Sequence, residues 1–232
     1  MDKYVLIVAG GKGLRMGGDL PKQFIPMRGK PLLMHTLEAF HRWDASARII
    51  LVLPEDHQPY WNMLCKEIGC KVPHAIVKGG DTRFFSVKNG LDWLLAERRR
   101  KGEEDSGLSL VAVHDGVRPF FSPEVVEACF DKAAVTGAVI PVVPMIDSLR
   151  ETDEKGSHPV DRSRYMAVQT PQVFLLELLT KAYEQPYSSL FTDDASVVEA
   201  MGHAIDTVPG DRENIKITTP FDLLIAEAMF AR

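Results

Sequence analysis

Cysteine is scarce in this chain of 232 residues. The three cysteines, Cys65, Cys70 and Cys129, are odd in number and form no CxxC pair, so the sequence indicates neither a disulfide framework nor a thiolate zinc site. Long apolar runs are missing too. Those at 5–9 and 49–53 are strand-sized, far below the roughly 18 residues that cross a bilayer. We therefore expect no membrane span.

The chain also lacks an excess of positive charge, since its formal net charge is −5. A general nucleic-acid binder normally carries a basic field, so no nucleic-acid partner is expected. The opening MDKYVLIVAGG has too short an apolar segment for a signal peptide and no small-residue cleavage site, which predicts a cytoplasmic protein. An anionic small substrate would need cations gathered locally, and the sequence has such a concentration of cationic residues near its N-terminus.

What the chain does have is a regular alternation of strand and helix patterns. We expect strands at 4–9, 47–54, 75–77, 109–115, 138–143 and 213–217. Helical spacing of apolar residues follows at 31–43, 59–68 and 87–94. Two further helices begin at Ser122-Pro123-Glu124 and Thr219-Pro220, and Gly137 ends the first of these. At this length one domain over 1–232 is expected, an α/β fold with a mostly parallel sheet and helices on both faces.

Two stretches depart from this alternation. Residues 98–107 mix three arginines, a lysine and acids around glycines, which predicts an exposed loop. Residues 144–170 alternate polar and apolar residues around a polar, glycine-containing centre, which predicts a projecting β-arm. Such an arm often contacts a partner chain.

A glycine-rich loop at 9–17, AGGKGLRMG, follows the first strand directly. Backbone N–H groups of such a loop can approach phosphate oxygens without obstruction by a Cβ. The loop is not a Walker loop, because no Gly-Lys-Ser/Thr follows, and Met16 replaces the third glycine of the dinucleotide fingerprint. A Rossmann dehydrogenase is therefore disfavoured.

Arg15 and Lys22 make this loop chemically interesting. They lie seven positions apart with Gly17, Gly18 and Pro21 between them, so the backbone can fold both cations over one phosphate cluster. There they would neutralise the charge that builds on a pentacovalent α-phosphate, while magnesium bridges other phosphate oxygens. The alternative for each is a solvated surface charge. Their position beside a strand-end glycine loop favours nucleotidyl transfer.

The segment that contains this loop, AGGKGLRMGGDLPKQF, resembles the signature of the 2-C-methyl-D-erythritol 4-phosphate cytidylyltransferases of non-mevalonate isoprenoid synthesis. Further motifs agree in the same order over nearly the whole chain: GGDTRFFSV, VHDGVRP, IDSLR, VDR, QTPQVF, TDDAS and DRENIKIT. The resemblance implies a Rossmann-like three-layer nucleotidyltransferase fold that transfers CMP from CTP to 2-C-methyl-D-erythritol 4-phosphate and releases pyrophosphate.

Site residues follow from the resemblance, position by position. It implies that Arg15, Lys22, Arg162 and Lys216 are catalytic. The nucleotide would be held by Ala9, Gly10, Gly11, Gly13, Gly80, Asp81, Ser86 and Asp115. The acceptor would be bound by Arg118, Ser148 and Thr170. Magnesium would be held mainly by the CTP phosphates, with Asp115 as the one candidate protein ligand.

The resemblance also implies a homodimer in which the 144–170 arm brings Ser148 and Arg162 to the neighbouring subunit's pocket. The family usually has threonine at the position of Ser148, and serine keeps the hydroxyl. No protein nucleophile is needed, because a phosphate monoester is largely ionised near neutral pH and can attack CTP directly. We therefore assign His114 to structure rather than to base catalysis.

Two alternatives stay open at this stage. Ribitol 5-phosphate is another phosphorylated polyol, and the cytidylyltransferases that use it share the glycine loop, PKQ, HD and NIK motifs. A regulator that binds nucleotide without turnover could also keep this fold, although the intact set of cations speaks against it.

Overall fold

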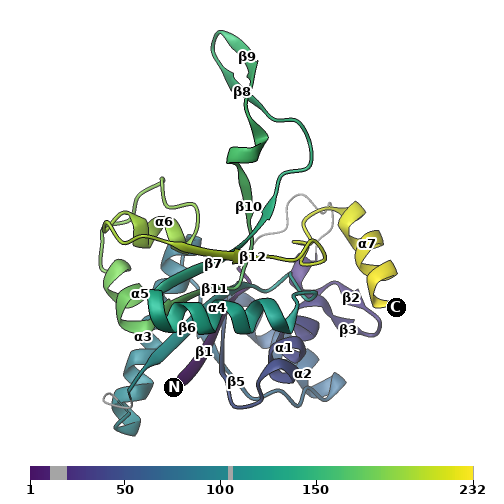
Figure 1. Ribbon diagram of the computed structural model, residues 1–232. Coiled ribbons are helices and arrows are strands. Elements are labelled where there is room, and N and C mark those ends of the chain that lie inside the picture. The colour runs from purple at the N-terminus through teal and green to yellow at the C-terminus, as the bar shows by residue number, and fades with distance from the viewer. Residues whose placement is uncertain (11–19, 104–106, 232) are drawn as a thin grey trace.

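A twisted eight-stranded sheet forms the centre of the molecule (Figure 1). The computed structural model describes residues 1–10, 20–103 and 107–231. The main path of the sheet runs β10-β7-β11-β6-β1-β4-β5, and β12 pairs with β7. The strands are β1 (Asp2–Val8), β4 (Arg48–Leu53), β5 (His74–Lys78), β6 (Ser109–Asp115), β7 (Ala138–Pro144), β10 (Met166–Val168), β11 (Gln172–Leu175) and β12 (Asp206–Pro209). Within this sheet, as far as the structure describes it, only β10 and β11 pair antiparallel to their neighbours, which confirms a mostly parallel sheet.

Helices cover both faces of this sheet, because alternate strand residues point to opposite sides. One face packs against α1 (Leu32–Trp43), α2 (Gln58–Ile68) and α4 (Pro123–Thr136). The other packs against α3 (Arg83–Lys101), α5 (Leu176–Ala182) and α6 (Asp194–Glu199). The last helix, α7 (Pro220–Phe230), packs beside the small hairpin of β2 (Pro26–Met27) and β3 (Lys30–Pro31). Short 3-10 helices lie between these elements: η2 (Lys22–Phe24), η3 (Glu55–His57) and η4 (Arg162–Arg164).

The predicted helix ends are confirmed where cap chemistry is strong. The Ser122 hydroxyl accepts from Val125 N–H at the start of α4, and Gly137 ends the helix at φ 91°. Thr219 opens α7 with a capping box, since its side chain and that of Asp222 each bond the other's backbone.

The parallel strands end on one edge of the sheet. β1 and β6 run in register from Asp2↔Ser109 to Val8↔Asp115, and β4 and β5 end beside them at Leu53↔Lys78. The chain after each of these strands therefore emerges at the same edge, where ligands of parallel sheets bind.

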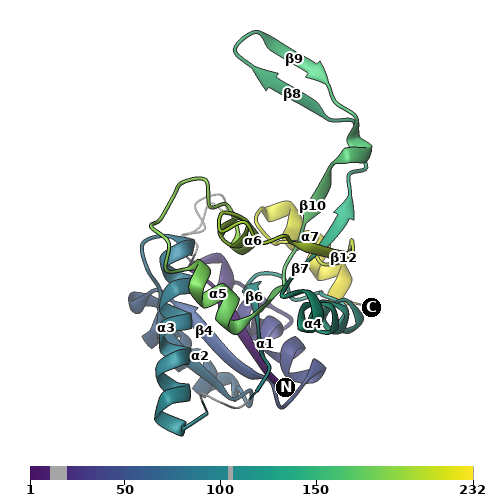
Figure 2. The ribbon, with the colours of Figure 1, turned by 60° about the vertical axis from the view of Figure 1, so that its left-hand side comes forward.

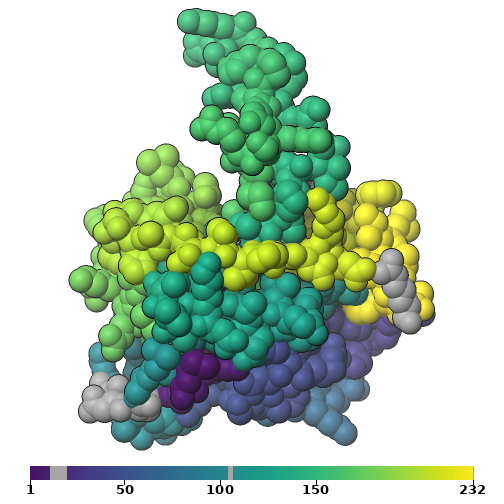
Figure 3. All heavy atoms as spheres, in the orientation of Figure 1, coloured from purple at the N-terminus to yellow at the C-terminus, as the bar shows by residue number. Residues whose placement is uncertain are grey.

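The predicted arm is confirmed as a hairpin that leaves the body of the molecule. β8 (Arg150–Asp153) and β9 (Gly156–Pro159) pair antiparallel, and all eight of their residues are exposed. Figures 2 and 3 show the hairpin standing clear of the rest of the chain.

Two predictions of local structure were wrong. Residues 98–101 form the last turn of α3 rather than a loop, and Arg98 is buried because it donates to the Tyr4 hydroxyl at 2.6 Å and to the Glu103 carbonyl at 2.7 Å. Residues 213–217 form no strand. Isolated bonds hold them, such as Ile217 N–H to the Val117 carbonyl at 3.1 Å, while the last strand is β12. In the part of the chain described, no helix combines the length and apolar character needed to cross a membrane.

Candidate functional site

A cleft lies at the edge where the parallel strands end, and it has two compartments. The first has a volume of about 210 Å³ and the second about 160 Å³. The first is lined by residues that include Ala9, Gly10, Lys22, Gln23, Gly80, Asp81, Ser86 and Val117. The second is lined by residues that include Arg118, Val168, Gln169, Thr170, Gln172, Thr192 and Asp193. Arg83, Asp115 and Lys216 line both compartments, so they form the wall that the two share.

The loop after β5 shapes one side of the first compartment. Gly80 N–H donates to the Ser86 hydroxyl at 3.1 Å, and this hydroxyl donates to the Thr82 carbonyl at 2.9 Å. A Cβ on Gly80 would lie 2.4 Å from the Cβ of Phe85, so only glycine allows the loop to fold this closely onto α3. Ser86, predicted beside the base and ribose, thus also braces the loop.

Gln23 secures the opposite side of this compartment. Its side chain is buried, and Nε2 donates to the Ala9 carbonyl at 2.9 Å while lying 3.2 Å from Nδ1 of His57. These contacts fasten η2 to the end of β1. Lys22, the preceding residue, consequently lines the same compartment as Ala9 and Gly10.

Asp115 lies at the centre of the shared wall. Its Oδ2 is 3.1 Å from Nζ of Lys216 and 3.1 Å from Nε of Arg118. Burial alone would raise the pKa of Asp115, but the charges of Lys216, Arg83 and Arg118 outweigh it and hold this pKa well below its ordinary value. The carboxylate is therefore ionised at neutral pH, surrounded by cations that can also bind phosphate.

His114 and Thr170 lie behind this wall. His114 is fully buried, and this burial lowers its pKa to about 4, so the ring is neutral at pH 7. A neutral, enclosed imidazole agrees with the structural role predicted for it. Thr170, predicted to bind the acceptor, lines the second compartment but also contacts Nδ1 of His114 at 3.0 Å.

Arg83 was not predicted as a site residue, but it lines both compartments. Its guanidinium makes two hydrogen bonds to the fully buried carboxylate of Asp194, at 2.9 and 2.6 Å. The Tyr183 hydroxyl donates to the same carboxylate at 2.6 Å. Bidentate pairing of this kind fixes the plane of the guanidinium.

A signal for Arg83 was present in the sequence. It stands directly after the Thr82 N-cap, in a first turn that holds no acid. The helix dipole favours negative charge at that position. An arginine there departs from the rule, and such departures are typical of functional sites. Thr192, also missed, gave no comparable signal.

Most of the predicted site residues come together in the cleft. The first compartment contains Ala9, Gly10, Lys22, Gly80, Asp81, Ser86, Asp115 and Lys216, and the second contains Arg118 and Thr170. Gly11, Gly13 and Arg15 lie outside the described residues.

Ser148 and Arg162 lie apart from the cleft of their own chain. Both are exposed and belong to the arm, where Arg162 donates to the Ile146 carbonyl. Over the described ranges, neither lines the two compartments.

A metal site made of protein groups alone is not found in the described part of the chain, which contains no cluster of three His, Cys, Asp or Glu side chains with the required geometry. Asp115 provides one carboxylate at the shared wall. Magnesium in nucleotide sites is typically held by one or two carboxylates together with substrate phosphates. The residues that line the described cleft fit that kind of site.

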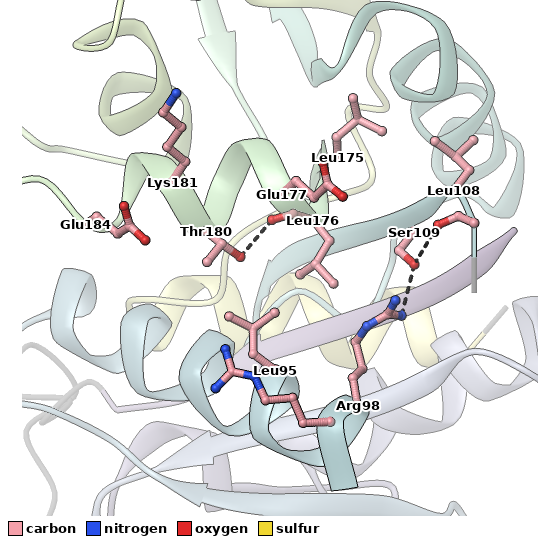
Figure 4. Close-up of a pocket in the computed structure, with 12 residues that line it drawn as sticks. Leu95, Arg98, Leu108, Ser109, Leu175, Leu176, Glu177, Thr180, Lys181 and Glu184 are labelled. Atoms are coloured by element: carbon pink, nitrogen blue, oxygen red, sulfur yellow. Dashed lines mark hydrogen bonds between the residues drawn. The ribbon is translucent and has the colours of Figure 1, made fainter. Parts of the chain in front are cut away.

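A larger cavity, of about 900 Å³, lies at the opposite edge of the sheet (Figure 4). It opens between α3 and α5, where Leu95 and Leu176 face each other, and Gly107 and Ser109 border it at the start of β6. None of the predicted site residues within the described ranges lines it. Its volume therefore says nothing about the chemistry of the cleft.

The chain is similar to known proteins over nearly its whole length. The family model for 2-C-methyl-D-erythritol 4-phosphate cytidylyltransferase matches residues 4–232. The enzyme of that name from Bacteroides fragilis is 55% identical over 99% of this chain and 100% of its own length. The one from Porphyromonas gingivalis is 51% identical over 98% of this chain and 97% of its own.

Solved structures give the same result at the level of the fold. The crystal structure of 2-C-methyl-D-erythritol 4-phosphate cytidylyltransferase from Thermus thermophilus superposes with a TM-score of 0.74 at 31% identity, over 100% of both chains. The 4-diphosphocytidyl-2C-methyl-D-erythritol synthase of Anaerococcus prevotii gives a TM-score of 0.78 at 28% identity, over 100% of this chain and 96% of that one.

Proposed function

Because the chain belongs to the 2-C-methyl-D-erythritol 4-phosphate cytidylyltransferase family, we propose that its cleft joins CTP and 2-C-methyl-D-erythritol 4-phosphate into 4-diphosphocytidyl-2-C-methyl-D-erythritol. The observation that supports this assignment to the cleft is its shared wall. Arg83, Asp115 and Lys216 line both compartments, so two phosphorylated substrates would meet across the same charged groups.

The first compartment would hold the nucleotide. Ala9, Gly10 and Gly80 line it, and Lys22 adds a cation to the same lining. Arg15, by the family resemblance, would act with Lys22 on the α-phosphate. The second compartment would hold the acceptor phosphate between Arg118 and Lys216.

The reaction then needs no protein nucleophile. A phosphate oxygen of the acceptor attacks the α-phosphorus of CTP, the bond from this phosphorus to the bridging oxygen breaks, and pyrophosphate leaves with the electron pair. Negative charge grows on the α-phosphoryl oxygens and on the leaving group. Lys22, Arg83 and Lys216 line the compartment in which this happens, and preorganised cations of this kind typically lower such a barrier by several kcal/mol.

A divalent cation, which we propose to be magnesium, would be held by the CTP phosphates with Asp115 beside them. When bound, it neutralises part of the triphosphate charge. Asp115 is ionised at neutral pH and can therefore bind the cation without first losing a proton.

The arm supports a proposal about assembly. Ser148 and Arg162 are exposed and flank the β8–β9 hairpin, which stands clear of the body of the molecule (Figures 1 and 2). We propose that they complete the second compartment of a neighbouring copy in a homodimer. We also propose a single domain over 1–232 with 144–170 as its arm, and the eight-stranded sheet that runs through the body of the described structure supports this. A cytoplasmic location stays a prediction.

An acceptor screen tests the proposed function. The purified chain is incubated with CTP, magnesium and one polyol phosphate, and pyrophosphate release is measured. We expect release with 2-C-methyl-D-erythritol 4-phosphate. Pyrophosphate release with ribitol 5-phosphate alone would show that ribitol 5-phosphate is the acceptor instead. CTP binding without pyrophosphate release with either acceptor would favour a regulator. A parallel series with ATP, GTP and UTP tests the choice of nucleotide.

A further inference from the structure

His114 is fully buried beside the site although the proposed chemistry does not use it. It is the second-last residue of β6. Its ring packs edge-on against Phe40, with ring centres 4.9 Å apart, and against Phe121 at 5.2 Å. Such surroundings suit a phenylalanine as well as a histidine, so the two ring nitrogens need a separate explanation.

The hydrogen bonds of this ring fix its tautomer. Nε2 lies 3.0 Å from the Arg118 carbonyl, which can only accept, so Nε2 carries the proton. Nδ1 therefore accepts from the Thr170 hydroxyl at 3.0 Å, and the same hydroxyl oxygen accepts from the backbone N–H of Asp115 at 3.2 Å. The three contacts form one directed chain of hydrogen bonds.

These three hydrogen bonds connect the segments that form the second compartment. Asp115 is the last residue of β6 and Arg118 follows in the turn after it, whereas Thr170 comes from the loop between β10 and β11. The hydroxyl proton of Thr170 is committed to His114. Thr170 therefore serves the compartment more by its position than as a donor to a ligand.

We infer that His114 is a positioning residue for the acceptor phosphate, because its two ring nitrogens hold Thr170 and the Asp115–Arg118 turn in the arrangement that lines the second compartment. The inference rests on the proposed function for the identity of that ligand. The Asp115 carboxylate, which lines both compartments, is held separately by Lys216, and the loop of Gly80 and Ser86 has its own hydrogen bonds. The nucleotide side of the cleft therefore depends less on His114 than the acceptor side does.

Three substitutions at His114 test its hydrogen bonds to Thr170 and to the Arg118 carbonyl separately. His114→Phe keeps the ring and its packing but removes both hydrogen bonds. His114→Asn places an amide oxygen near Nδ1 and keeps an acceptor for Thr170, while His114→Gln places an amide nitrogen near Nε2 and keeps a donor for Arg118. We expect His114→Phe to raise KM for 2-C-methyl-D-erythritol 4-phosphate about tenfold and to leave KM for CTP within about twofold. The two amide variants should fall between it and the wild type.

His74→Phe is the matched control. This half-buried ring accepts from Trp61 Nε1 at 3.0 Å and contacts the Val72 carbonyl at 2.8 Å, so it loses the same number of hydrogen bonds at the start of β5, far from the cleft. We expect it to lower thermal stability without changing either KM. Equal KM values for the acceptor in His114→Phe and His74→Phe, or a parallel rise of both KM values in His114→Phe, would overturn the inference.

A measurement without substrate tests the hydrogen bonds themselves. In protein labelled with ¹⁵N-histidine, the signal that disappears in His114→Phe should show the proton on Nε2. A proton on Nδ1 would overturn the inference. The acceptor screen would instead reveal a failure of the proposed function, because it uses the wild-type chain.

Discussion

Lys216 places its Nζ 3.1 Å from Oδ2 of Asp115, although the two residues come from distant parts of the chain. The Lys216 side chain is 42% exposed and that of Asp115 only 13%, so a half-exposed cation is paired with a largely buried carboxylate. This ion pair holds a cation at the shared wall before any substrate arrives. A bound phosphate can then share Lys216 without the cost of first gathering the charge.

Asp115→Asn should lower stability in a pH-dependent manner. The pKa of Asp115 in the folded chain is held below its unfolded value of about 3.9, so the ionised carboxylate stabilises the fold above that pH. We expect the variant to lose about 3 kcal/mol in free energy of unfolding at pH 7, because Lys216 and Arg118 remain unneutralised. Urea unfolding from pH 7 to pH 3 measures the difference, which should be constant down to about pH 5 and shrink below it. A difference that stays constant to pH 3 would contradict the assignment.

Lys22→Ala should mainly reduce kcat. Removing a preorganised charge from a site of developing charge typically costs about 10²- to 10³-fold in rate. Lys22→Arg keeps the charge at a different reach and should recover part of it. Lys88→Ala is the control, since this exposed lysine pairs with Asp92 on the surface of α3. Steady-state kinetics with CTP measure kcat for each variant. An unchanged kcat in Lys22→Ala would exclude a catalytic role for Lys22.

Arg83→Lys tests the residue that only the structure revealed. Lysine keeps the charge but cannot make the two parallel hydrogen bonds to Asp194. We expect kcat/KM to fall about tenfold or more for both substrates, because Arg83 lines both compartments. Arg100→Lys is a matched control, since Arg100 pairs in the same two-bonded way with Glu97 but on an exposed helix surface. Equal kinetics in the two variants would show that Arg83 acts by charge alone.

The sheet could be predicted because the patterns that specify its strands and the helices around them are local in the sequence. Apolar runs of strand length alternate with helical spacing, and the caps at Ser122 and Thr219 are recognisable from a few residues. The failures have physical causes. Arg98 belongs to a charged stretch that looks solvated, yet Tyr4 and the Glu103 carbonyl bury it through contacts that no local pattern shows. Residues 213–217 have strand composition, but no neighbouring strand pairs with them in the described structure.

The candidate site was predicted by resemblance more than by local chemistry. Position at the ends of parallel strands supported Asp115 and the glycines, which the structure brings to one edge. Arg83 was missed because the one local signal, an arginine in the first turn of α3, does not reveal that it pairs with Asp194 of α6. Long-range ion pairs of this kind leave no spacing signature in a sequence.

Mixing two inactive variants tests whether the arm serves a neighbouring copy. Arg162→Ala damages the arm and Lys22→Ala damages the cleft, so each alone should be nearly inactive. A mixed dimer would contain one intact site, formed by the cleft of the first variant and the arm of the second, and random reassociation should restore about a quarter of the wild-type activity. Mixing Lys22→Ala with Lys216→Ala should restore none, because both changes damage a cleft. If the arm instead folded back onto its own chain, neither mixture would regain activity, and Arg162 would act within one subunit.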